Sequence, residues 1–384
     1  MDFKKYLTDD ILKFWLSGID KEDGGIITHL KRDGSFYNDE KSVWFQGRAL
    51  WTFAKAYNFI EKRAEYLEAC HHIYSFLPKC GDENFRMSYI VSKKGDSILK
   101  RRYYFSETFA AIGCMEYYKA TGNEEVLEKA EKYFDVAYSI FKNPSLTTPK
   151  FTNVKAKGLS PAMILLATAQ VMRSGAKKPE KYNAIAKEMV KIILESGFIC
   201  DEAGAMLESI SPEGKLINTP TGRIVNPGHS LEAAWFLISE GVYQNDDNII
   251  KAGKHIIDIT MPHAELLNHE GIICFRDVCG EPPLQLEWDM KKWWPQCEAI
   301  IANIVAYKVF GEEKYKKDFD RLVNYCMKYF ADSEYGEWYS ILHYDNTVAN
   351  SAKGHITKGP FHLPRMLMIA YSLSKGDSIL DFMK

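Results

Sequence analysis

The chain has 384 residues and a formal net charge of −2, and 46% of its residues are hydrophobic and 13% aromatic. The near-neutral charge, with Lys and Arg scattered along the chain, excludes the basic footprint of a nucleic-acid-binding protein. No run approaches the roughly 20 apolar residues of a membrane span, and the polar N-terminus lacks the apolar core of a signal peptide. Eight cysteines without a C-x-x-C pair predict reduced thiols, so we expect a cytoplasmic protein.

The predicted elements alternate between amphipathic and apolar helices, with turn-rich segments between them. An amphipathic segment over residues 5–18 is followed by a hairpin signal around Asp33-Gly34, and an apolar helix then begins at Trp44. This order recurs to the end of the chain. Further amphipathic helices are expected near 64–77, 124–141, 180–196, 247–262 and 313–330, apolar helices from about 104, 159, 227, 293 and 359, and hairpins near 86–98, 205–217, 271–280 and 336–346.

The recurrence of helix pairs at a nearly constant interval indicates a repeat architecture. Six apolar and six amphipathic helices predict an all-α (α/α)6 barrel, with the apolar helices inside, the amphipathic helices outside and short β-hairpins in the loops. An open superhelical solenoid is the alternative, but neither terminal repeat carries the polar cap that an open array needs for solubility. Because no Pro/Gly/Ser-rich linker divides the chain, we expect one catalytic domain over residues 1–384.

Unusual polar residues occur at the start of five of the six apolar helices. In a barrel these starts open at one mouth, so residues far apart in sequence are expected to converge there. The third helix is the exception, since its start reads Ser160-Pro161-Ala162-Met163. The polar residues are Arg48 in the first helix, Ser106 and Glu107 in the second, His229 and Glu232 in the fourth, Gln296 and Glu298 in the fifth, and His362 and Arg365 in the sixth.

Aromatic residues at the same helix starts suggest a carbohydrate ligand. Flat apolar faces suit the C–H sides of sugar rings, and Arg48, Gln296 and Glu298 are candidates to bind hydroxyl groups. Trp338 is expected to line the rim of this site or to brace it. The candidate stacking residues are Trp44, Tyr103, Tyr104, Trp293, Trp294 and Phe361.

Two histidines at one mouth can act as an acid/base pair, since imidazole titrates near pH 6.5. On opposite faces of an open-chain sugar, His229 and His362 would remove a proton from C2 and return one from the other side through an enediolate. Arg48 would stabilise the oxyanion, and Glu232 or Glu298 would orient an imidazole. No metal or redox cofactor is required. A zinc site of His229, Glu298 and His362 lacks a recognised spacing.

Four motifs resemble the N-acylglucosamine 2-epimerase family: Trp44–Arg48 (WFQGR), Asn226–Glu232 (NPGHSLE), Trp293–Ala299 (WWPQCEA) and Gly359–Arg365 (GPFHLPR). The resemblance implies an (α/α)6 barrel and interconversion of N-acetyl-D-glucosamine and N-acetyl-D-mannosamine. It implies that His229 and His362 are the acid/base pair and that Arg48 and Glu298 are essential. It also implies a homodimer, with ATP as a possible activator that is not consumed. The family's cellobiose 2-epimerases have a histidine at the start of the third inner helix, where this chain has Ser160-Pro161-Ala162-Met163.

Three other functions are left open by the residues. An aldose–ketose isomerase, such as a mannose isomerase, uses the same enediolate but returns the proton to C1. A glycoside hydrolase needs two carboxylates flanking a glycosidic bond, which Glu107, Glu232 and Glu298 could nominally supply. A non-catalytic sugar-binding or protease-binding protein would keep the tryptophans but would not need both histidines.

Overall fold

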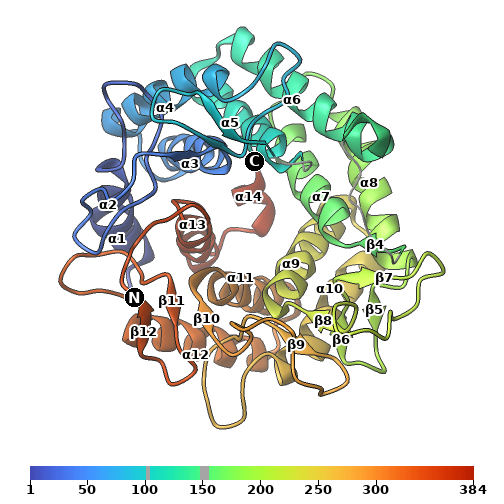
Figure 1. Ribbon diagram of the computed structural model, residues 1–384. Coiled ribbons are helices and arrows are strands. Elements are labelled where there is room, and N and C mark those ends of the chain that lie inside the picture. The colour runs from blue at the N-terminus through green and yellow to red at the C-terminus, as the bar shows by residue number, and fades with distance from the viewer. Residues whose placement is uncertain (101–103, 148–154) are drawn as a thin grey trace.

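The computed structural model describes residues 1–100, 104–147 and 155–384, and in these residues the helices form two concentric rings (Figure 1). The inner helices are buried on most sides, and α11 is buried at every position from Pro295 to Ala306. The inner ring consists of α3 (Val43–Lys55), α5 (Phe105–Thr121), α7 (Ser160–Arg173), α9 (Pro227–Gln244), α11 (Trp293–Phe310) and α13 (His362–Ser374).

The outer helices bury one stripe each, as Tyr315, Phe319, Leu322 and Cys326 do on α12. Because α1 packs against α13, the first and last repeats meet and the ring is closed. The predicted (α/α)6 barrel is therefore confirmed. The outer ring consists of α1 (Phe3–Tyr6), a π-helical turn (Leu7–Ile11) and α2 (Leu12–Leu16), then α4 (Ala64–Phe76), α6 (Glu124–Lys142), α8 (Pro179–Glu195), α10 (Asp247–Thr260) and α12 (Glu313–Tyr329). Among the described helices, none has both the length and the apolar character needed to cross a bilayer.

Inner helices α3 and α5 approach each other through glycine. A Cβ atom on Gly47 would lie 2.3 Å from the carbonyl carbon of Phe109, and one on Gly113 would lie 2.5 Å from the Gly47 carbonyl oxygen. Only a residue without a side chain fits at either position, because such contacts are far inside van der Waals distance. The close approach brings the starts of the two helices, and so their cavity-facing residues, together at the mouth.

Short antiparallel strands lead into several inner helices. β1 (Lys41–Ser42) precedes α3 and pairs with β2 (Ile90–Val91), which pairs with β3 (Ser97–Leu99); β10 (Lys291–Lys292) precedes α11 and pairs with β11 (Ile341–Leu342), which pairs with β12 (Val348–Asn350). β4 (Lys157–Gly158) pairs with β7 (Ser209–Ile210), β5 (Ile199–Cys200) with β6 (Ala205–Met206), and β8 (Ile224–Val225) with β9 (Arg276–Asp277). The hairpin expected at 271–280 is therefore wrong, because its strand pairs with the strand that enters α9.

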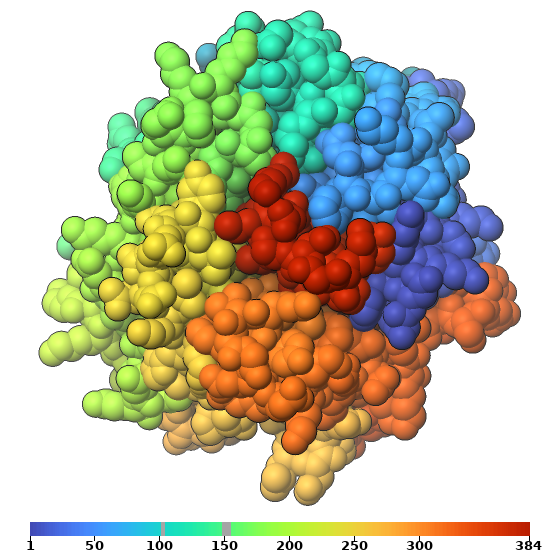
Figure 2. All heavy atoms as spheres, turned by 180° about the vertical axis from the view of Figure 1, so that it is seen from behind, coloured from blue at the N-terminus to red at the C-terminus, as the bar shows by residue number. Residues whose placement is uncertain are grey.

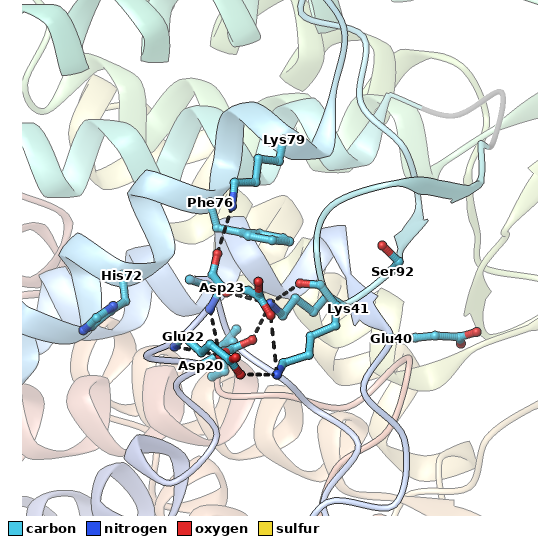
Figure 3. Close-up of polar contacts among 12 residues, drawn as sticks. Asp20, Glu22, Asp23, Glu40, Lys41, His72, Phe76, Lys79 and Ser92 are labelled. Carbon is cyan, nitrogen blue, oxygen red and sulfur yellow. Dashed lines mark hydrogen bonds and ion pairs between the residues drawn. The ribbon is translucent and has the colours of Figure 1, made fainter.

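A buried lysine anchors the entry to α3. The Lys41 ammonium donates to Asp20 Oδ2 (2.8 Å) and to the carbonyl oxygens of Gly24 (2.7 Å) and Lys93 (2.6 Å). Figure 3 shows Lys41 reaching into the loop that carries Asp20, Glu22 and Asp23. Lys93 in turn pairs with Glu22 at 2.7 Å. These lysines offset part of the negative charge of the loop, and Lys41 ties the loop to β1, the strand that leads into α3.

The C-terminal segment closes the rear of the barrel. After α13 the chain turns back through α14 (Ile379–Met383), which lies at the centre of the rear face (Figure 2). The Phe382 ring packs edge-on against Trp51 and Phe59, with ring centroids 6.3 and 5.7 Å apart. The barrel is therefore open at the N-terminal ends of the inner helices and covered at the other end.

Candidate active site

A cavity of about 330 Å³ opens where the inner helices begin. The structure brings most of the predicted site residues together there, as the convergence of helix starts implies. The predicted residues that line the cavity are Trp44, Arg48, His229, Glu232, Trp293, Trp294, Phe361 and His362, and Arg365 joins them.

The start of α9 places His229 against a tryptophan. The Asn226 side chain caps the helix by accepting from Gly228 N at 2.9 Å. A Cβ atom on Gly228 would lie 2.7 Å from the Trp294 ring, so glycine is required for the two helices to approach here. The Trp294 ring centroid consequently lies 5.0 Å from that of His229 and 5.6 Å from that of His362. The two imidazoles thus flank one indole at the mouth of the cavity.

Glu298 is the centre of a buried hydrogen-bond network around His362. Its Oε1 contacts His362 Nδ1 at 2.7 Å and accepts from Arg365 Nη2 at 2.7 Å, while its Oε2 accepts from Trp235 Nε1 at 2.9 Å. Arg365 Nη2 also donates to Glu232 Oε1 at 2.6 Å. Because the Glu298 carboxylate binds Nδ1 of His362, that imidazole presents Nε2 for chemistry.

Glu208 holds the other histidine. Its Oε1 and Oε2 lie 3.0 and 3.1 Å from His229 Nδ1. Glu232 or Glu298 was expected to orient an imidazole: Glu298 does so at His362, whereas at His229 the contact is made by Glu208, because the Glu232 carboxylate binds Arg365. Glu208 lies in the loop between β6 and β7, outside the helical repeat, so no periodicity relates it to His229.

The two histidines have opposite pKa shifts. Burial lowers the pKa of His362 well below the usual 6.5, and the nearby Arg365 and Arg48 charges lower it further. Burial acts in the same direction on His229, but the Glu208 carboxylate, together with the charges of Glu232 and Glu298, outweighs it, so the pKa of His229 is raised above 6.5. Near neutral pH, His362 is therefore neutral while His229 can carry a proton.

Arg48 reaches the cavity between aromatic rings. Its guanidinium carbon lies 4.0 Å from the Phe109 ring centroid and 4.7 Å from that of Phe361. Burial lowers the pKa of Arg48 to about 9, which still leaves the group charged near pH 7. Its Nε has no hydrogen-bond partner among the described residues. Arg48 thus offers the cavity a cation with unused donor capacity.

Gln296 does not belong to the site, contrary to the prediction that it binds substrate. Its side chain accepts from Ile272 N (2.8 Å) and donates to the carbonyl oxygens of Ile272 (2.8 Å) and Lys292 (3.0 Å). Gln46, at the same position of α3, makes the equivalent bonds to the backbone of Ile26 and Ser42. Both glutamines fasten a loop to the start of an inner helix.

Replacing Gln296 with Leu is expected to lower stability without affecting substrate binding. The change leaves the buried backbone N–H and C=O groups of Ile272 without the partners that Gln296 supplies, which costs about 1–3 kcal/mol for each unsatisfied group. Denaturant unfolding should therefore show a loss of several kcal/mol, while KM of the folded variant stays at the wild-type value. A tenfold rise in KM with unchanged stability would restore Gln296 to the substrate site.

Three other candidates also lie away from the cavity. Tyr104 is buried outside its lining, and its hydroxyl has no hydrogen-bond partner within residues 1–100, 104–147 and 155–384; Tyr103 lies outside these described residues. Glu107 is bound by Arg86 and by Met87 N. Trp338 is buried and donates to the Tyr6 hydroxyl at 3.1 Å, so it braces the barrel wall rather than lining the rim.

The residues that could hold a metal ion differ from those considered in the sequence. Among the described residues, Glu232, Glu298 and His362 place potential ligand atoms within 4.8 Å of one another, while His229 is not in this group. Arg365 Nη2 lies within hydrogen-bond distance of both carboxylates, at 2.6 and 2.7 Å. The guanidinium therefore occupies the position where a cation would balance these charges.

Comparison with known proteins places this arrangement in a family. The sequence profile described as N-acylglucosamine 2-epimerase (GlcNAc 2-epimerase) matches residues 25–359. The chain belongs to this family. It is 31% identical to the N-acylglucosamine 2-epimerase of Rattus norvegicus over 373 residues, covering 94% of this chain and 88% of the rat protein. It is 24% identical to the cellobiose 2-epimerase of Dictyoglomus turgidum, covering 95% and 96% of the two chains.

Solved structures of other sugar epimerases show the same fold. The cellobiose 2-epimerase from Bacillus thermoamylovorans superposes with a TM-score of 0.83 at 22% identity, covering 96% of this chain and 97% of that one. Family membership therefore identifies the chain as a carbohydrate epimerase or isomerase.

Proposed function

We propose that this protein interconverts N-acetyl-D-glucosamine and N-acetyl-D-mannosamine by moving the proton on C2. The observation that carries the proposal is the pair of imidazoles flanking Trp294, with ring-centroid distances of 5.0 Å for His229 and 5.6 Å for His362. Neutral His362 removes the C2 proton of the open-chain sugar from one face, and protonated His229 delivers a proton to the other face. The reverse reaction exchanges their roles.

The charge that develops on O1 of the enediolate requires a fixed donor. Arg48 supplies one, because its guanidinium faces the cavity with an unsatisfied Nε. Arg365 already binds Glu232 and Glu298, and it supports the carboxylate that orients His362. Arg48 and Arg365 thus have different tasks although both are arginines at helix starts.

The carboxylates do not support glycoside hydrolysis. That reaction needs two carboxyl groups on opposite sides of a glycosidic bond. Glu232 and Glu298 instead bind the same Arg365 nitrogen, at 2.6 and 2.7 Å, and so lie on one side of the cavity. Glu107 is bound by Arg86 outside the cavity lining. The histidine pair is therefore the better candidate for the chemistry.

The N-acetylated substrate is supported by sequence likeness, since identity is 31% to the rat N-acylglucosamine 2-epimerase and 24% to a cellobiose 2-epimerase. Ser160 at the start of α7, where the cellobiose enzymes have histidine, supports the same choice. The family resemblance is also the support for a homodimer and for ATP as an activator, while the free cysteines are the support for a cytoplasmic location.

Incubation with N-acetylmannosamine, mannose and cellobiose separately tests the proposal. NMR should show the C2 epimer as the product of N-acetylmannosamine and much slower conversion of the other two sugars. A ketose product would instead identify an aldose–ketose isomerase. Turnover of none of the three sugars would contradict catalysis by the histidine pair.

The pH profile of kcat/KM should be a wide bell, because the active pair carries one proton. Activity falls on the acid side when His362 becomes protonated, below pH 6.5, and on the alkaline side when His229 loses its proton, above pH 6.5. In Glu208→Gln the anion that raises the pKa of His229 is lost, so the alkaline limb should move to lower pH. The acid limb, which reports His362, should stay in place. Movement of the acid limb alone would mean that His229 sets the acid limb and His362 the alkaline limb.

A further inference from the structure

The cavity extends below the histidines along one side of the barrel. Helices α11 and α13 line it only with first-turn residues, whereas α3 lines it from Trp44 to Lys55 and α7 from Ser160 to Ser174. At 1.5 Å per residue, the lining part of α3 is about 16 Å long. We call this extension, bounded by α3, α5 and α7, the deep arm. It begins at the level of the reactive groups and ends near α14.

The wall of the deep arm on α7 is mostly apolar, because the hydroxyls of Thr168 and Ser174 donate to backbone carbonyls of the same segment. Ile164, Ala167 and Val171 are half-exposed although they lie on an inner helix, and their spacing places them on one face. All three line the cavity, so their exposed surface faces the deep arm. Ile112 of α5 and Phe236 of α9 add further apolar lining. Sugar hydroxyls would lose hydrogen bonds to water against this wall, while methylene groups would gain from burial.

The far end of the deep arm is closed by Lys55 and α14. The Lys55 ammonium lies 5.1 Å from the Phe382 ring centroid and 4.0 Å from Glu116 Oε1. Lys55 is only 4% exposed, and Phe382 and Met383 complete the lining. A group that enters from the mouth therefore has an apolar passage of limited length.

We propose that the deep arm receives the acyl group on the C2 nitrogen, and that the protein acts on N-acylhexosamines with acyl chains longer than acetyl, with Ile164 and Ala167 limiting their size. This inference rests on the proposed 2-epimerase function. The acyl group is the apolar part of such a substrate, and the deep arm is the apolar continuation of the cavity.

The wild-type protein tests the inference with N-acetyl-, N-propanoyl- and N-butanoyl-D-mannosamine. We expect kcat/KM to rise with chain length, with KM falling by up to about fourfold for each added methylene that is buried. The inference is overturned if the butanoyl substrate is converted less efficiently than the acetyl one. Absence of turnover even with the acetyl substrate would instead contradict the proposed function, so the two failures are distinguishable.

Two variants of α7 should change chain-length preference in opposite directions. Ala167→Phe fills the deep arm and should lower the butanoyl-to-acetyl ratio of kcat/KM at least tenfold, whereas Ile164→Ala should raise it. Ala176→Phe adds the same bulk just beyond α7, at a half-exposed alanine outside the cavity lining, and should leave the ratio unchanged. An unchanged ratio in a folded Ala167→Phe variant would overturn the inference. If the Ala167→Phe variant does not fold, the inference is tested by the butanoyl-to-acetyl ratio of Ile164→Ala and by the wild-type substrate series, and an unchanged ratio in Ile164→Ala would overturn it.

Discussion

His362→Asn and His229→Asn are each expected to stop epimerisation while leaving one-sided proton exchange. Loss of a general acid or base typically lowers the rate by about 10²–10⁴. The remaining histidine still faces C2, so it can remove and return the proton of the one epimer that presents a hydrogen to it. In D2O, each variant should therefore wash deuterium into C2 of a single epimer without converting it.

The two histidine variants should be complementary. The epimer that exchanges in His362→Asn should be silent in His229→Asn, because the two imidazoles serve opposite faces. Circular dichroism and thermal unfolding provide the control that both variants are folded. Exchange of both epimers in either variant would show that a single base serves both faces, and wild-type epimerisation in either would remove that histidine from the mechanism.

Glu298→Gln is expected to lower kcat by about 10²–10⁴, the range over which catalysis falls when a histidine loses the carboxylate that orients it. The amide cannot provide the charge that faces both His362 Nδ1 and Arg365 Nη2, each 2.7 Å away. Arg365 retains Glu232 as a partner at 2.6 Å, so the fold should survive the change. Steady-state kinetics with N-acetylmannosamine measures the effect.

Glu107→Gln is the matched control for Glu298→Gln. Glu107 is also a fully buried carboxylate near the start of an inner helix, but it binds Arg86 and Met87 N outside the cavity lining. This variant should lose stability and keep its kcat. An equal loss of kcat in both variants would mean that the effect of Glu298 is a general consequence of disturbing a buried charge.

The ring of helices could be predicted because each inner helix is apolar throughout and each outer helix only along a stripe. The convergence of His229, Glu298 and His362 follows from the same repeat, since equivalent helix starts meet at one end of a closed barrel. Two pairs illustrate this. Arg48 follows Trp44 by four residues, and Glu298 follows Trp294 by four, so each polar residue shares a helix face with a tryptophan that lines the cavity.

The errors in the candidate site have two physical causes. Gln296 lies two positions after Trp294, and because each helical residue turns by about 100°, its side chain points away from that of Trp294. The helical period alone does not exclude it, because Trp293 also lines the cavity and lies three positions before Gln296; the bonds to the Ile272 backbone decide the direction of the side chain. Glu208, in contrast, lies in a loop between strands, where no period constrains direction. Its contact with His229 depends on how the β4–β7 pair packs beside α9, which the sequence does not reveal.

The most direct test is the conversion of N-acetylmannosamine in D2O, with the isotope at C2 of the first N-acetylglucosamine formed determined by NMR. Two-base catalysis predicts one deuterium at C2 in nearly every product molecule, because the proton delivered comes from the second histidine, which exchanges with solvent. Product that keeps its original hydrogen at C2 would contradict proton transfer between the two faces by His229 and His362.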